Sequence, residues 1–101
     1  MPRMLPEEAR RLLSNVPEQF TFRCHNGDVY WNLCDLTRAS SNLEDHVFAH
    51  HVNDERNDFA NWIADVIGDR ALARELWRTR NPATVSRRLA ERVAFLKSRT
   101  D

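Results

Sequence analysis

Residues 20–33 read Phe-Thr-Phe-Arg-Cys-His-Asn-Gly-Asp-Val-Tyr-Trp-Asn-Leu, and this stretch decides the fold class. Apolar residues alternate with polar ones on both sides of Asn26-Gly27, as in strands that are buried on one face. Asn-Gly is the preferred pair for a two-residue type I′ turn, because both central positions of that turn need positive φ. The stretch therefore predicts an antiparallel β-hairpin with the pairs His25–Asp28, Cys24–Val29, Phe22–Trp31 and Phe20–Leu33. Its opposite face would carry the pairs Thr21–Asn32 and Arg23–Tyr30.

The predicted register also bears on the two cysteines of the chain, Cys24 and Cys34. It places Cys34 opposite Gln19, roughly 17 Å along the ladder from Cys24. A disulfide needs Cα atoms within about 7 Å of each other. We therefore expect no intramolecular bridge, and we expect Cys24 to be a reduced core residue.

Outside the hairpin the apolar residues recur every three or four positions, which predicts helices. We expect a first helix over 6–13, a short helix near 35–40 and a longer one near 42–52, with one continuous helix as the alternative to the last two. Ser41 and Glu44 fit a capping box at the start of the longer helix. A further helix begins after Asn57 or Asp58, which would act as its N-cap, and ends at Gly68, a residue suited to the left-handed C-cap position.

The remaining sequence predicts two more helices and so sets the fold class. Asp69 would cap a helix whose inner face contains Leu72, Ala73, Leu76 and Trp77. Asn81-Pro82 precedes a last helix over 82–99 with an apolar stripe at Val85, Leu89, Val93 and Leu96. The predicted fold is α+β, with one antiparallel β-hairpin packed against a cluster of four to six short helices.

Length and composition favour one globular domain over residues 1–101. Of the 101 residues, 42% are hydrophobic and 30% are charged, which is ordinary for a globular chain. No apolar stretch approaches the roughly 20 residues of a membrane-spanning helix, and the N-terminus lacks the apolar region of a signal peptide. We therefore expect a cytoplasmic protein that does not bind a membrane.

The net charge of zero conceals an asymmetry along the chain. Residues 1–69 contain six arginines and twelve acidic residues, whereas residues 70–101 contain nine basic and three acidic residues. Such an asymmetry marks either a partner-binding face or an internal match between the two parts.

The polar run from His50 to Ile63 contains the main candidate binding residues, which are His51, Asn53, Asn57, Asp58 and Trp62. One interpretation is structural, because amide, imidazole and carboxylate side chains commonly cap helices and support turns. The other is a binding site for a partner or ligand.

Catalytic and metal chemistry have little support in the sequence. His46 and His50 are four residues apart on a predicted helix and are the candidate metal ligands, but no third and fourth ligand follow at regular spacing. There is no nucleophile elbow, glycine-rich loop or paired acidic motif. We therefore expect no catalytic residues, no metal and no cofactor, with a metal-binding or enzymatic domain as the less favoured alternative.

The C-terminal arginines offer a second candidate surface. Arg78 and Arg80, and then Arg87, Arg88, Arg92 and Arg99 on the last helix, could follow a phosphate backbone or bind an acidic protein. Overall charge neutrality argues against a dedicated nucleic-acid binder.

A group of motifs resembles an uncharacterised prokaryotic family of domains of unknown function. These motifs are Phe48-x-x-His51-Val52-Asn53, Asn57-Asp58-Phe59-Ala60-x-Trp62-Ile63 and Val66-x-Gly68-Asp69-x-x-Leu72-Ala73-x-x-Leu76. The similarity spans residues 19–77, includes Phe20-x-Phe22 and Leu33-x-x-Leu36, and leaves out the arginine-rich helix over 82–99. It implies no established activity. The expected function is a small non-catalytic interaction or accessory module that binds another protein or itself, with nucleic-acid binding as the alternative.

Overall fold

The computed structural model describes residues 3–100, in which helices pack on one another and a small hairpin lies against the helix Leu33–Ser40. Residues 1, 2 and 101 of the predicted domain lie outside the described part. The elements follow in the order α1 (Pro6–Leu13), η1 (Glu18–Phe20), β1 (Phe22–Arg23), β2 (Val29–Tyr30), α2 (Leu33–Ser40), α3 (Asp45–His51), α4 (Asp58–Trp62), η2 (Ile63–Ile67), α5 (Arg70–Trp77) and α6 (Pro82–Ser98). The predicted α+β class with one hairpin is confirmed.

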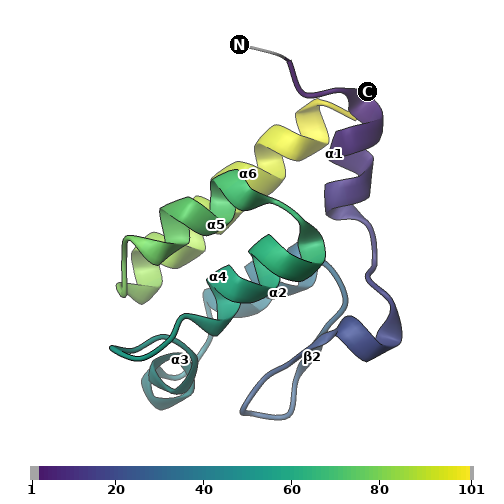
Figure 1. The fold of residues 1–101 in the computed structure, drawn as a ribbon. Helices are drawn as coiled ribbons and strands as arrows, with labels where there is room; N and C mark the ends of the chain where they lie inside the picture. Colours follow the sequence, from purple (N-terminus) through teal and green to yellow (C-terminus); the bar gives the residue numbers. More distant parts are fainter. Residues whose placement is uncertain (1–2, 101) are drawn as a thin grey trace.

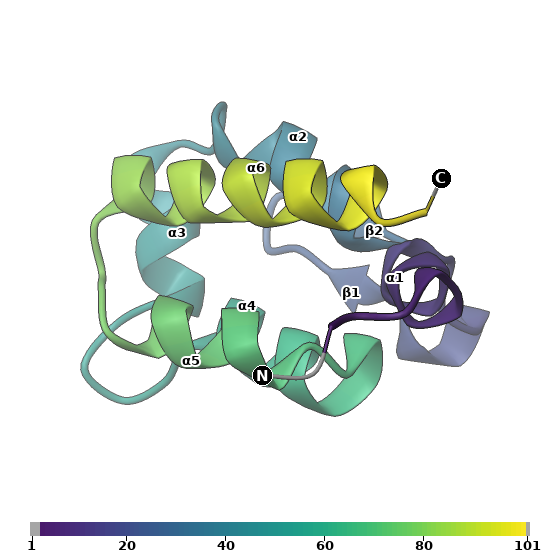
Figure 2. The ribbon, with the colours of Figure 1, turned by 90° about the horizontal axis from the view of Figure 1, so that it is seen from above.

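Helix α6 organises the packing, because it contacts α1, α2 and α5 along its length. Figure 2 shows α6 along one side of the molecule, with α4, η2 and α5 along the opposite side. α1 lies beside the C-terminal end of α6 in both views (Figures 1 and 2), where Arg10 donates to the carbonyl of Thr100. The predicted α6 stripe faces this core, which also contains Leu33, Leu36, Phe59, Ile63 and Leu72.

The hairpin is present, but the predicted register is wrong by one residue. Phe22 pairs with Tyr30 and Arg23 with Val29, and the loop has three residues because the N–H of Cys24 donates to the carbonyl of Asp28. Within this loop Gly27 alone has positive φ, at 97°, which is typical of a turn followed by a glycine bulge rather than of a type I′ turn. A slip of one residue exchanges the two faces of a strand. Tyr30 therefore enters the core, while Val29 and Trp31 are exposed.

Helix starts mostly follow the predicted capping chemistry. The side chains of Asn57, Asp69 and Asn81 accept hydrogen bonds from the backbone N–H three residues later, as does Asn32 at the start of α2. The predicted capping box is wrong: α3 begins after Glu44 without a side-chain cap, and the Ser41 hydroxyl donates to the carbonyl of Arg38 instead.

The helix after Asn57 ends in a π-helical turn, η2. The backbone N–H groups of Gly68 and Asp69 both donate to the carbonyl of Ile63, at 2.8 and 3.0 Å. Gly68 has the predicted left-handed conformation, with φ 91°. This sharp end turns the chain directly into α5 and buries Asp69, whose carboxylate receives two hydrogen bonds from Arg92 of α6 at 2.7 and 2.9 Å.

Candidate functional site

His51 lies at the end of α3 with both ring nitrogens occupied. The backbone N–H of His25 donates to its Nε2 at 3.0 Å, so the proton of the neutral ring is on Nδ1, which donates to Asp58 Oδ2 at 2.9 Å. The ring is 5% exposed and packs against Phe22 and Phe59, with centroids 5.1 and 5.3 Å away. This pair resembles a catalytic histidine–aspartate arrangement, but no nitrogen is left to accept a proton from a substrate. The two hydrogen bonds of His51 join the end of α3 to His25 in the hairpin loop and to Asp58 at the start of α4.

Asn57 is buried and bridges two helices. Its side-chain oxygen accepts from the N–H of Ala60 at 3.0 Å, and its amide nitrogen donates to the carbonyl of Leu76 at 3.0 Å. It therefore caps the start of α4 and also satisfies a carbonyl near the end of α5.

Asn53, Asp58 and Trp62 also make their polar contacts within the chain. Asn53 donates to the carbonyls of Ala49 and His50 and so ends α3. Asp58 lies 3.4 Å from Nε of Arg56, and the indole N–H of Trp62 donates to the carbonyl of Phe20 at 2.8 Å. Throughout residues 3–100, no buried side-chain polar atom lacks a hydrogen-bond partner. The structure thus brings His51, Asn53, Asn57 and Asp58 together as one internally bonded corner, while Trp62 anchors α4 to η1.

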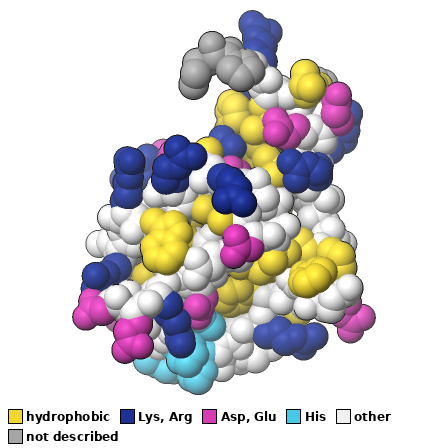
Figure 3. All heavy atoms as spheres, in the orientation of Figure 1, with side chains coloured by type: hydrophobic (Ala, Val, Ile, Leu, Met, Phe, Trp, Pro, Cys, Tyr) yellow, Lys and Arg dark blue, Asp and Glu magenta, His cyan; other side chains and the backbone are white. Residues whose placement is uncertain are grey.

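The candidate metal ligands do not share a site. The rings of His50 and His25 stack at 3.9 Å, and Arg56 donates to both the ring and the carbonyl of His50. Desolvation, followed by the neighbouring imidazoles and the Arg56 guanidinium, lowers the pKa of His50. His46 instead faces Glu44, and within the described residues no three His, Cys, Asp or Glu side chains are grouped to hold a metal ion. The histidines visible in Figure 3 gather at the lower edge of that face.

The three arginines of α6, and Arg99 directly after its end, occupy different surroundings. Arg92 is held by buried Asp69 and lies over the ring of Phe95, as Arg99 also does, at 5.2 and 5.3 Å from the centroid. Arg88 lies 3.8 Å from Glu91. Arg87 faces the other side of the helix, toward α2. Arg92 therefore has a structural role in joining α5 to α6.

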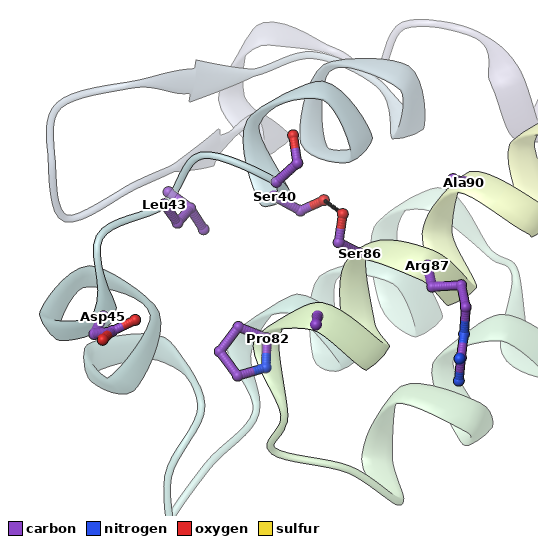
Figure 4. Close-up of a pocket in the computed structure, with 9 residues that line it drawn as sticks. Ser40, Leu43, Asp45, Pro82, Ser86, Arg87 and Ala90 are labelled. Atoms are coloured by element: carbon purple, nitrogen blue, oxygen red, sulfur yellow. Dashed lines mark hydrogen bonds between the residues drawn. The ribbon is translucent and has the colours of Figure 1, made fainter.

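A hollow of about 520 Å³ lies between α6 and the segment joining α2 to α3. Ser40 donates to Ser86 across its floor at 3.1 Å, while Asp45 and Arg87 stand at opposite ends (Figure 4). The other lining side chains are small or apolar, among them Ala83 and Ala90. This arrangement contains no pair of groups placed for acid–base or nucleophilic chemistry.

A polar surface, of which only Arg78 was a predicted binding residue, lies on the outer side of α5. Arg70, Arg74 and Arg78 follow one another at four-residue spacing, so their side chains share one face of the helix. In the part of the chain that the structure describes, none of the three forms an ion pair. Trp77 belongs to the same face and is 52% exposed, so its predicted place in the core is wrong. In Figure 3, basic side chains gather over the half of the face formed by α5 and α6.

We call this set of Arg70, Arg74, Trp77 and Arg78 the α5 face. The four-residue spacing of its arginines was visible in the sequence. The exposure of Trp77 was not, because the residue lies next to the apolar stripe at the last position of its helix.

Comparisons with known proteins give no match, either to a family model, to a curated protein or to a solved structure. The resemblance of residues 19–77 to an uncharacterised prokaryotic family stays a prediction. No helix among residues 3–100 combines the length and the apolar character needed to cross a bilayer.

Proposed function

We propose that this protein is a small non-catalytic interaction module that binds an acidic partner through the α5 face. The observation that supports this most directly is the row of three exposed arginines without ion-pair partners among the described residues, next to an exposed tryptophan. Arginine and tryptophan are the residue types enriched at the energetic centres of protein interfaces. Unpaired guanidinium groups attract anionic surfaces and raise association rates at low salt.

The two other candidate surfaces offer less to a partner. The polar atoms of the His51 corner are already bonded to neighbouring groups, so a ligand would have to break those bonds. Arg92 of α6 holds a buried carboxylate, and moving it to a partner would leave Asp69 unpaired at great cost.

A second copy of the chain is one acidic partner that the α5 face could bind, because residues 1–69 have a net charge of −6. Pairing the α5 face of one copy with the acidic part of another is a heterologous contact, which builds rings or open chains rather than closed two-fold dimers. Sedimentation velocity at low and high salt distinguishes such association from a monomer.

The test uses polyanions and a matched charge reversal. We expect the protein to bind fluorescent poly-L-glutamate or to self-associate at low salt, and we expect Arg74→Glu to weaken that binding or association. Arg23→Glu is the control, because Arg23 is also exposed and lies on β1, where the same charge change should have little effect. A protein that stays monomeric and binds no polyanion at low salt contradicts the proposal, as does equal loss in both variants.

A further inference from the structure

Two hollows meet at Thr79, in the turn between α5 and α6. The first, about 140 Å³, is lined by Trp77 together with Asn53, Arg56 and Arg80. The second, about 280 Å³, is lined by Arg78, Thr84, Arg88 and Glu75. Thr79 lines both, so a ligand that crosses this residue would contact an aromatic ring on one side and two guanidinium groups on the other.

Except for Glu55, the charged side chains of the first hollow are paired within the protein. Arg80 is paired with Asp54, and Arg56 is bound to Asp58 and to the carbonyl of His50. The remaining exposed feature is the ring of Trp77, which offers a flat apolar surface without an unpaired charge nearby except Glu55. Such a surface suits a planar uncharged group rather than a phosphate or a carboxylate.

The second hollow has the opposite character. Arg78 has no ion-pair partner within residues 3–100, and Arg88 has only the 3.8 Å contact with Glu91. Two arginines outnumber the single carboxylate of Glu75, and the hydroxyls of Thr79 and Thr84 add short polar side chains. Guanidinium groups and hydroxyls are the usual phosphate contacts of proteins.

An uncharged planar group next to an anionic one is the repeating pattern of a nucleotide chain. Arg74 and Arg70 continue the basic row along α5 in steps of about 6 Å, the rise of four helical residues. We propose that the acidic partner is a single-stranded nucleic acid, with one base stacked on Trp77 and a neighbouring phosphate at Arg78 and Arg88. This inference rests on the proposed function and specifies its partner.

A single strand fits better than a duplex. Bases within a duplex stack on each other and do not present their faces to a side chain, whereas unpaired bases are free to stack on an aromatic ring. An acidic peptide would satisfy the arginines but has no recurring planar group for Trp77.

The test measures binding by fluorescence anisotropy for five probes: oligothymidine, oligouridine, an abasic strand of equal charge, duplex DNA and poly-L-glutamate. We expect Trp77→Ala to weaken binding of the two oligonucleotides by about 5- to 150-fold and to leave binding of the abasic strand unchanged. Trp77→Phe should restore most of the loss. Because Trp77 is half exposed, its removal should lower the melting temperature by less than about 15 °C and leave the protein folded at the temperature of the binding assay.

The basic row gives a second readout. Arg74→Glu should weaken binding of every polyanion, and removal of each phosphate contact should reduce the slope of log affinity against log salt by about 0.7. The control Arg23→Glu should change neither the affinity for polyanions nor the salt dependence of that affinity.

Two outcomes separate this inference from the proposed function. If poly-L-glutamate or duplex DNA binds as tightly as the oligonucleotides, or if Trp77→Ala leaves oligonucleotide binding unchanged, the single-strand inference is wrong while the α5 face remains a binding surface. If none of the five probes binds at low salt and the protein does not self-associate, both proposals are wrong.

Discussion

Replacing Arg92 with methionine should destabilise the fold by about 2–3 kcal/mol. Methionine keeps most of the apolar stem but removes the guanidinium that donates both hydrogen bonds to Asp69. The Asp69 side chain is only 1% exposed, so its carboxylate would be left buried without its counter-charge. Breaking a fully buried pair in this way costs about 3–5 kcal/mol. We expect less because Arg92 is 21% exposed and Asp69 keeps its position at the start of α5.

Urea unfolding followed by circular dichroism measures this loss, which for a domain of this size lowers the melting temperature by about 10–20 °C. Arg88→Met is the matched control, because Arg88 lies one turn earlier on α6 and its contact with Glu91 is long and exposed. That change should cost less than about 0.5 kcal/mol. The double variant Asp69→Asn/Arg92→Met should be more stable than Arg92→Met alone, since asparagine still caps α5 and carries no charge. Equal losses for Arg92→Met and Arg88→Met would refute the structural role given to Arg92.

Three further changes probe other parts of the fold. Asn57→Ala should cost about 2 kcal/mol in urea unfolding, because it removes a helix cap and the buried hydrogen bond to the carbonyl of Leu76, which keeps the longer contact with the N–H of Thr79. A loss below about 0.5 kcal/mol, as for a simple surface change, would count against the bridge. Gly68→Ala should cost about 1–2 kcal/mol because an alanine is strained at φ 91°, and calorimetry would show the reasoning wrong if stability rose. NMR titration should give His50 a pKa below its ordinary value, and Arg56→Ala should raise that pKa. Because the pKa of His50 is lower in the folded state than in the unfolded state, the unfolded state binds more protons between the two pKa values. The stability of the protein should therefore fall as the pH drops from the unfolded pKa of His50 toward the folded one. An unchanged midpoint in Arg56→Ala would exclude the guanidinium as a cause.

The hairpin shows where prediction from the sequence reached its limit. Asn26-Gly27 correctly located the turn, because glycine is needed wherever φ is positive. The same dipeptide fits both a two-residue turn and the last two positions of a three-residue loop, and these differ by one residue of register. Alternation did not decide between them because Tyr30 and Trp31 are both aromatic and the strands are only two residues long.

Helix capping was predictable where the cap is a hydrogen bond between one side chain and the backbone a few residues later in the sequence. Asn57 and Asp69 satisfy their own helix starts, so their local sequence was sufficient. Their partners across the fold were not predictable, because the link from Asn57 to α5 and that from Asp69 to Arg92 depend on how distant helices pack. The α5 face was missed for a related reason: periodicity orients a helix but cannot show that Trp77, at its end, escapes the core.

The hydrogen bond from the backbone of His25 to the ring of His51 has a consequence for the order of folding. A hairpin with two-residue strands is too short to persist alone in water. Its loop amide is held by a side chain 26 positions away, so we expect the hairpin to become ordered only once α3 has formed and docked. In hydrogen exchange this single loop amide should be protected well beyond its neighbours in the loop. Its exchange rate would then report how often α3 separates from the hairpin, a motion that no other amide of the loop records.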